Sequence, residues 1–197
     1  MALVFQYGSN TSSQRLNSYD RMRGDVRPLG LVCTKEPHQL DFTVWSNSNK
    51  CAAADIVPGS GRTIWGVLYK IPDHLIRQDT SGERKSLDEI EGEGKNYGRI
   101  EISLRYRNGR PINQKVITYV VKERQPNLET SIDYVSHIIY GLKEFNAPKG
   151  YIEYVKQRVI KNNPLLRSYI EKNEFSPHKK HNTNSKNPKS CGVRFLY

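Results

Sequence analysis

The sequence predicts an α+β fold, because strand-like runs occupy most of its first 121 residues and two amphipathic helices follow them. Residues 3–7 are mostly apolar and aromatic, as in a buried strand. Residues 63–71 form the most strand-like run and are almost continuously apolar, so we expect both faces of that strand to be covered. Residues 132–145 carry apolar side chains at helical spacing. The 197 residues are enough for one domain with a hydrophobic core and an appended tail.

The first strand-like run breaks at Gly8-Ser9-Asn10. Glycine permits a tight bend, and Ser and Asn are residues that cap the start of a helix. A strand that turns through these residues into a helix leaves several backbone N–H groups pointing at one spot, which suits a carboxylate or a phosphate. The same residues can instead merely cap a helix or close a turn, so the stretch alone leaves both interpretations open.

Four further strands are expected, at 29–33, 40–45, 100–107 and 115–121. Asn108-Gly109 is a hairpin turn signal between the last two. Residues 51–57 are ambiguous, because their apolar pattern fits neither period clearly. Gly66, inside the strand 63–71, indicates a bulge or a close backbone approach.

The helices are expected to begin with a short one at 13–19 that ends near Gly24. A helix that begins at Pro72 is interrupted by polar residues 79–84 and resumes at 86–92, where Ser86 and Glu89 have the spacing of a capping box. Thr130 or Ser131 caps the helix at 132–145, and the remaining helical segments are expected at 150–161 and 165–170.

The net charge of +11 is concentrated in the last quarter of the chain. Residues 147–197 contain 11 Lys or Arg and 3 Asp or Glu, which leaves a net charge of only +3 for residues 1–146. The nearly balanced main body argues against a chain whose whole purpose is to bind nucleic acid. Residues 176–190 contain no apolar side chain, as in a disordered tether. We therefore expect one domain at 1–172 and a basic, disordered tail at 173–197.

Several classes of protein are excluded by what the sequence lacks. It has no run of about 18 apolar residues and no basic region before its first apolar run, so we expect neither a membrane span nor a signal peptide. The three cysteines are widely spaced and match no zinc or disulfide pattern, which indicates a reducing, cytoplasmic location. The five histidines lack metal-ligand spacing, and no Walker or dinucleotide glycine pattern occurs, so no metal or cofactor is expected.

The acidic run 88–93 is the second stretch of chemical interest. Acidic runs are usually solvated surfaces, and that interpretation remains open here. Leu87 and Ile90, however, are three residues apart and should face the core, which places Glu91 beside the buried side just before Gly92. A carboxylate held there would be partly desolvated, and its pKa would rise toward the range of a general base.

Three segments together resemble the gamma-glutamylcyclotransferase-like family. They are Phe5-Gln6-Tyr7-Gly8-Ser9-Asn10, then Trp65-Gly66-Val67-Leu68-Tyr69-Lys70-Ile71, then Leu87-Asp88-Glu89-Ile90-Glu91-Gly92 with Tyr97-Gly98-Arg99. A later Thr130-Ser131-Ile132-Asp133-Tyr134 resembles the family's Ser/Thr-introduced helix with a Tyr. The resemblance covers about residues 3–155, and it implies an α+β fold with a small curved, barrel-like mixed sheet and flanking helices.

The resemblance implies the chemistry of γ-glutamyl compounds. In that reaction the α-amine attacks the γ-amide of the same molecule and releases 5-oxoproline and an amine or amino acid. Glu91 would be the general acid/base, and the backbone of Tyr7, Gly8, Ser9 and Asn10 would hold the substrate carboxylate. Tyr119 and Tyr134 match positions where the family places hydroxyl groups near the substrate, although both can equally be core residues with satisfied hydroxyls.

Departures from the family pattern leave a second hypothesis open. Gln6 replaces a usual small residue, Thr11 replaces a common Leu, and the polar insertion 79–85 and the basic tail have no counterpart in that pattern. The alternative is a non-catalytic binding protein of the same fold that recognises an anionic partner, such as nucleic acid, through its pocket or through tail lysines. The tail lacks aromatic residues until Phe195 and Tyr197, which does not support base stacking. The carboxylate at Glu91 favours the enzyme.

Overall fold

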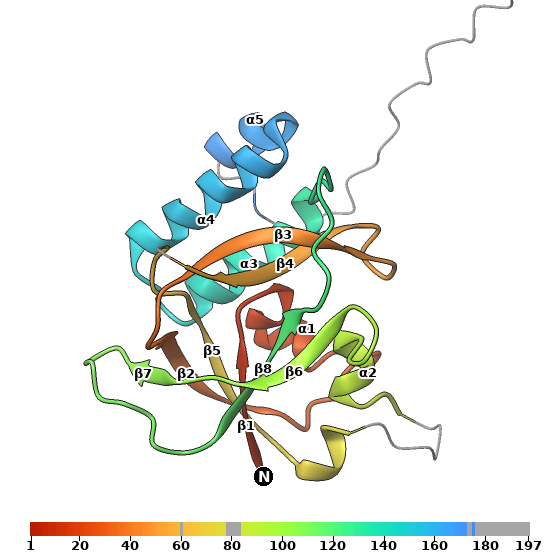
Figure 1. Cartoon of the computed structure of the whole chain (residues 1–197), viewed down its shortest axis with the longest axis vertical. Helices are drawn as coiled ribbons and strands as arrows, with labels where there is room; N and C mark the ends of the chain where they lie inside the picture. Colours follow the sequence, from red (N-terminus) through yellow and green to blue (C-terminus); the bar gives the residue numbers. More distant parts are fainter. Residues whose placement is uncertain (60, 78–83, 173–174, 176–197) are drawn as a thin grey trace, which may run out of the picture.

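Six strands form a mixed sheet in the computed structural model, which describes residues 1–59, 61–77, 84–172 and 175. The strand order is β6-β8-β1-β5-β2-β7. The strands are β1 (Ala2–Gln6), β2 (Arg27–Thr34), β5 (Trp65–Ile71), β6 (Tyr97–Glu101), β7 (Leu104–Tyr106) and β8 (Val116–Val121). β1 pairs with β8 in parallel and with β5 antiparallel, so the N-terminal strand occupies an interior position of the curled sheet (Figure 1).

Burial explains why β1 and β5 form the interior of the sheet. Val4, Phe5, Val67, Leu68 and Tyr69 are at most 1% exposed, and they contribute to two hydrophobic clusters on opposite sides of these strands. β5 is therefore covered on both faces, as its continuous apolar run predicted. Gly66 permits a close backbone approach, because a Cβ there would overlap the carbonyl oxygen of Gln6.

A long two-stranded hairpin lies between the six-stranded sheet and helices α4 and α5 in Figure 1. It consists of β3 (His38–Ser46) and β4 (Cys51–Pro58), so the ambiguous segment 51–57 is a strand. The fully buried Asp55 on β4 ties the hairpin to β8, since its carboxylate accepts hydrogen bonds from Val121 N at 3.1 Å and Arg124 Nε at 2.7 Å.

Two longer helices pack over the hairpin and the sheet. α3 (Ile132–Glu144) begins at Ser131, whose hydroxyl accepts from Tyr134 N, and α4 (Lys149–Asn162) packs against β3. The short helical segments are η1 (Ser9–Thr11), α1 (Ser13–Leu16), η2 (Asp73–Leu75), α2 (Leu87–Glu91), η3 (Pro164–Leu166) and α5 (Arg167–Glu171). In the described part of the chain, no helix is long and apolar enough to cross a membrane.

The α+β class and the curved mixed sheet with flanking helices are confirmed, but four local predictions are wrong. The segment 100–107 is not one strand, because its alternation spans the end of β6 and all of β7, which pair with different neighbours. The Asn108-Gly109 turn therefore does not join the strands that pair, and β8 returns to β6 instead. The helix expected at Pro72 is a single 3-10 turn, and the one expected at 13–19 ends at Leu16.

Two expectations concern parts of the chain that lie largely outside the described residues. The predicted tail 173–197 is described only at Phe175, and the polar insertion 79–85 only at Arg84 and Lys85. The proposed domain boundary at residue 172 stays a prediction.

Candidate active site

The sheet brings every predicted site residue to one small polar cavity of about 30 Å³. It is lined by Gln6, Tyr7, Gly8, Ser9, Asn10, Ala54, Glu91, Tyr97, Tyr119 and Tyr134. These residues come from the end of β1 and η1, from the hairpin, from α2, and from β6, β8 and α3. The cavity is therefore assembled by tertiary contacts between elements far apart in the sequence.

Helix α2 places Glu91 at the cavity. Its start is fixed by a capping box, in which Ser86 Oγ accepts from Glu89 N and the Glu89 carboxylate accepts from Ser86 N. Leu87 is fully buried and anchors the helix to the core. Gly92 adopts φ 72° and ends the helix in the left-handed conformation that glycine tolerates best. Glu91 is thus the last residue of α2, and its position is fixed by the capped start of the helix and by the glycine that ends it.

The Glu91 carboxylate is bound by two side-chain amides. Asn10 Nδ2 donates to Oε1 at 2.7 Å, and Gln6 Nε2 donates to the same oxygen at 3.0 Å. Burial raises the pKa of Glu91 above its ordinary value, while the hydrogen bond from Asn10, the charge of Arg21, the hydrogen bond from Gln6 and the charge of Arg15 lower it in part. A partly desolvated acid with a raised pKa is suited to exchange a proton near neutral pH.

The loop from Tyr7 to Asn10 forms the opposite side of the cavity. Thr11 N and Thr11 Oγ1 both donate to the carbonyl oxygen of Gly8 and close the turn. Within the described part of the chain, no acceptor is hydrogen-bonded to the N–H groups of Gly8, Ser9 and Asn10. These N–H groups are therefore available to a ligand, and their role in binding an anion stays a prediction. The prediction concerned only the backbone of Asn10, whereas in the structure its side chain also donates a hydrogen bond to Glu91.

Four tyrosines surround the cavity, and burial raises the pKa of each, so all four are neutral at pH 7. Tyr7 and Tyr97 donate to the carbonyl oxygens of Tyr119 and Ala54 at 2.6 and 2.9 Å. Tyr119 donates to Asp88 Oδ1 at 2.7 Å, and Asp88 is also bound by Arg99. The hydroxyl proton of Tyr119 is therefore donated to Asp88 and is not available to a ligand.

Tyr134 is different, because its oxygen accepts a hydrogen bond. The N–H of Ala54 donates to Tyr134 Oη at 2.9 Å, which leaves the hydroxyl proton for a ligand. A side chain at Gly8 would approach this hydroxyl to 3.1 Å, so glycine keeps the cavity open there.

An outer pocket of about 250 Å³ adjoins the cavity and shares Ser9, Asn10, Glu91, Tyr97 and Tyr134 with it. Its other side is formed by the hairpin turn at residues 45–49, by Arg21, and by residues 89–92, 95 and 96. The inner cavity, at about 30 Å³, exceeds the roughly 10–15 Å³ needed to hold one water molecule, so it admits polar groups of a ligand that extends into the outer pocket. The outer pocket can hold the body of a small ligand.

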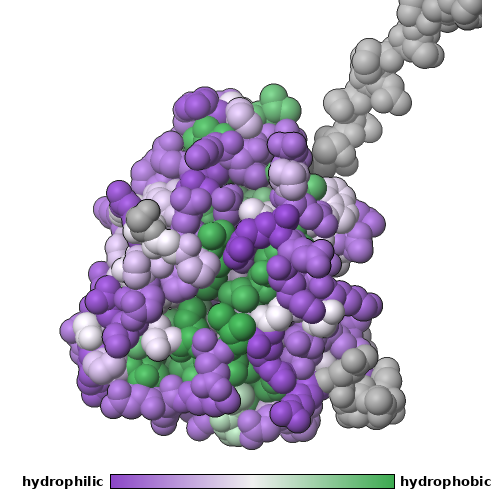
Figure 2. All heavy atoms as spheres, viewed as in Figure 1, coloured by the Kyte–Doolittle hydropathy of each residue, from purple (hydrophilic) through white to green (hydrophobic). Residues whose placement is uncertain are grey.

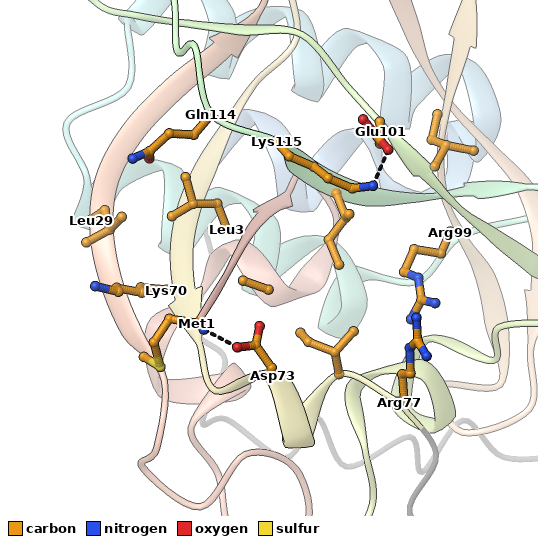
Figure 3. Close-up of a pocket in the computed structure, with 14 residues that line it drawn as sticks. Met1, Leu3, Leu29, Lys70, Asp73, Arg77, Arg99, Glu101, Gln114 and Lys115 are labelled. Atoms are coloured by element: carbon orange, nitrogen blue, oxygen red, sulfur yellow. Dashed lines mark hydrogen bonds and ion pairs between the residues drawn. The ribbon is translucent and has the colours of Figure 1, made fainter.

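A larger groove of about 1120 Å³ lies elsewhere, between η2 and strands β1, β5, β6 and β8 (Figure 3). Figure 2 shows hydrophobic residues gathered at the centre of one face of the molecule with hydrophilic residues around them. The two carboxylates of the groove, Asp73 and Glu101, are more than half exposed and are paired with the Met1 amine and Lys115. A solvated, paired carboxylate is a poor general base, so the smaller cavity at Glu91 is the candidate active site.

Three cavity residues were not selected from the sequence: Gln6, Ala54 and Tyr97. Tyr97 belongs to the segment Tyr97-Gly98-Arg99, which carried the family resemblance, and that membership could have identified it as a site residue. Ala54 gives no such signal, because its role is a backbone one within an ambiguous apolar run. Among the described residues, no group of three or more His, Cys, Asp or Glu side chains could hold a metal ion.

Comparison with known proteins agrees with this architecture. The model of the AIG2-like family matches residues 63–155. The uncharacterized protein loc79017 from Homo sapiens is 25% identical, with a TM-score of 0.66 over 79% of this chain and 86% of that protein. A structure titled gamma-glutamyl cyclotransferase is 24% identical, with a TM-score of 0.67 over 87% of this chain and 98% of that one.

YkqA from Bacillus subtilis is 21% identical, with a TM-score of 0.64 over 80% of this chain, which spans about half (54%) of the YkqA chain. A comparison with curated protein sequences gives no match. The AIG2-like match over residues 63–155 and the shared fold agree with the resemblance inferred from the sequence: the chain has the gamma-glutamyl cyclotransferase fold.

Proposed function

We propose that this protein cyclises a γ-glutamyl compound and releases 5-oxoproline and an amine or amino acid. The observation that carries the proposal is the partly desolvated carboxylate of Glu91, held across a polar cavity from the unpaired N–H groups of Gly8, Ser9 and Asn10. The fold shared with a gamma-glutamyl cyclotransferase supports it. No cofactor is needed, because the substrate supplies both nucleophile and electrophile.

The reaction moves two protons from the α-nitrogen to the departing nitrogen and exchanges one C–N bond for another. Glu91 removes a proton from the substrate α-ammonium, and the free amine then attacks the γ-carbonyl carbon. When the tetrahedral intermediate collapses, the bond to the original amide nitrogen breaks and protonated Glu91 returns the first proton to that nitrogen. The new ring nitrogen then gives up its second proton through Glu91 to the departing amine, so that the lactam is neutral and the amine leaves as an ammonium ion. Because the attack is intramolecular, holding the chain in a folded conformation supplies much of the rate.

The remaining cavity residues bind the two oxygen-bearing groups of the substrate. The N–H groups of residues 8–10 would donate hydrogen bonds to the α-carboxylate, which is attracted by their partial positive charge. The hydroxyl proton of Tyr134 would be donated to the γ-carbonyl oxygen as negative charge develops on it. The outer pocket would hold the released amine or amino acid.

The test is 5-oxoproline release from a panel of γ-glutamyl amines, γ-glutamyl amino acids and glutathione. Glu91→Gln keeps the shape of the side chain but cannot exchange the proton, so we expect kcat/KM to fall by about 10²–10⁴-fold. Glu93→Gln is the matched control, because Glu93 is exposed and does not line the cavity, and it should leave turnover unchanged. The proposal fails if no substrate of the panel is cyclised, or if Glu91→Gln is as active as the parent.

A further inference from the structure

Gln6 is one of the residues at which this sequence departs from the family pattern, and it contacts the proposed base directly. It is the last residue of β1, is 5% exposed, and pairs with Val67 of β5. From this fixed strand position its amide reaches Glu91 Oε1 at 3.0 Å. A small residue at this position, as the family resemblance leads one to expect, could not make that contact.

The second amide on Glu91 is also fixed in its orientation. Arg21 Nη1 donates to Asn10 Oδ1 at 3.1 Å, and a guanidinium can only donate. The oxygen of the Asn10 amide therefore faces Arg21, and its NH₂ group faces Glu91 at 2.7 Å. Both amides thus donate to Oε1 of Glu91, and among the described residues no donor is bonded to Oε2.

We infer that Gln6 is a positioning residue, which together with Asn10 holds Oε1 of the charged Glu91 and leaves Oε2 to exchange the proton with the substrate. The inference rests on the proposed function for the role of Oε2, whereas the effect of Gln6 on the carboxylate does not depend on any substrate. Two donors on one oxygen fix the plane of the carboxylate and stabilise its ionised form. A single donor would leave the side chain free to rotate about that contact.

Gln6 also counteracts the burial of Glu91. Desolvation raises the pKa of this carboxyl, and the hydrogen bonds from Asn10 and Gln6 oppose it. The other charged or titratable groups around it are Arg15, Arg21, Tyr7, Tyr97, Tyr119 and Tyr134, with Glu89 and Lys95 on the outer pocket. Arg15 stays charged and the four tyrosines stay neutral near pH 7, so none of these five groups titrates there when Gln6 is substituted.

The experiment compares the parent with Gln6→Met, which keeps the length of the side chain and removes the donor. The pKa of Glu91 is read in two ways: from the acidic limb of kcat/KM against pH, and from the ¹³C chemical shift of its carboxyl carbon in protein labelled at glutamate, assigned with Glu91→Gln. We expect both values to rise by about one pH unit, because a hydrogen bond to the ionised form is lost. Gln39→Met is the control, since Gln39 lies on β3 and does not line the cavity.

The two measurements separate this inference from the proposed function. If the carbon titration of Glu91 moves in Gln6→Met but neither protein cyclises any substrate, Gln6 does position the carboxylate and the proposed reaction is wrong. If cyclisation occurs and neither value moves, the positioning role of Gln6 is wrong and the reaction stands. Thermal unfolding of each variant verifies that it is folded, and Gln6→Glu, which places a second negative charge beside Glu91, should raise both values further than Gln6→Met does.

Discussion

Tyr134 joins the hairpin to the candidate active site through a single hydroxyl group. The buried N–H of Ala54 donates to this oxygen, and the Tyr134 side chain is 5% exposed. Tyr119 instead donates its hydroxyl proton to Asp88, whose charge is neutralised by Arg99. These contacts divide the tyrosines of the cavity into one with a proton available and three whose hydroxyls donate to the protein.

Tyr134→Phe should both destabilise the protein and slow cyclisation. Loss of the hydroxyl leaves the buried Ala54 N–H without its acceptor, which costs about 1–3 kcal/mol. It also removes the donor proposed for the γ-carbonyl oxygen. Tyr140→Phe, on the same helix but 40% exposed, is the control and should change neither quantity. Urea denaturation measures the first effect and 5-oxoproline release the second, and equal behaviour of the two variants would contradict this role for Tyr134.

At the scale of elements, helix α3 supports the loop that carries Gly8, Ser9 and Asn10. A Cβ at Gly141 would overlap the backbone of Thr11 and Ser12, so the helix and η1 are in direct contact there. Tyr69 Oη donates to Thr11 O at 3.1 Å from the other side. The loop is therefore held between α3 and β5, and its free N–H groups keep a fixed direction.

Gly141→Ala should push η1 away from α3. Overpacking of this kind costs about 1–3 kcal/mol, and displacement of the loop should raise KM for a γ-glutamyl substrate. Gly150→Ala is the matched control, because Gly150 is also helical, lies at the start of α4, and has open space around the added methyl group. Its expected effect is neutral or stabilising, by up to about 1 kcal/mol. Thermal unfolding and steady-state kinetics of both variants test this, and a Gly141→Ala protein as stable as Gly150→Ala would refute the contact.

At the scale of the whole molecule, the hairpin and the six-stranded sheet are separate sheets that close the cavity together. Ala54 and the turn at 45–49 come from the hairpin, whereas Glu91, Tyr97 and Tyr119 come from the other side. Asp55 connects the two parts, since its fully buried carboxylate accepts from Val121 N, from Arg124 Nε and from Thr43 Oγ1. Asp55 therefore provides a buried charged link between the two sheets, beside the hydrogen bond from Tyr97 Oη to Ala54 O.

Asp55→Ala should be strongly destabilising. Removal of the carboxylate leaves the buried Val121 N without its acceptor, which costs about 1–3 kcal/mol, and it also breaks the pair with the half-exposed Arg124. The control is Glu101→Ala, which breaks the exposed pair with Lys115 and should cost at most about 1 kcal/mol. The measurement is the free energy of unfolding in urea, and a cost for Asp55→Ala no larger than that for Glu101→Ala would show that Asp55 does not hold the sheets together.

Local patterns in the sequence predicted much of this arrangement. The capping box of Ser86 and Glu89, the glycine that ends α2 and the buried Leu87 together predicted a desolvated carboxylate at Glu91. The bend after Tyr7 likewise predicted free N–H groups. These features depend on residues within a few positions of one another, where periodicity and capping chemistry are informative.

Contacts over long distances in the sequence were decided only by the tertiary structure. Gln6 and Asn10 reach Glu91 across 85 and 81 residues, and Tyr119 reaches Asp88 across 31. The division of 100–107 between β6 and β7 was likewise decided by the tertiary structure. Alternation in the sequence shows which residues face the core, but it does not show which strand is the partner. The sequence by itself determined the chemical groups and the local conformations that present them. The packing of the curled sheet against the hairpin decided which of those groups meet, since burial and pairing energies depend on neighbours that no local pattern specifies.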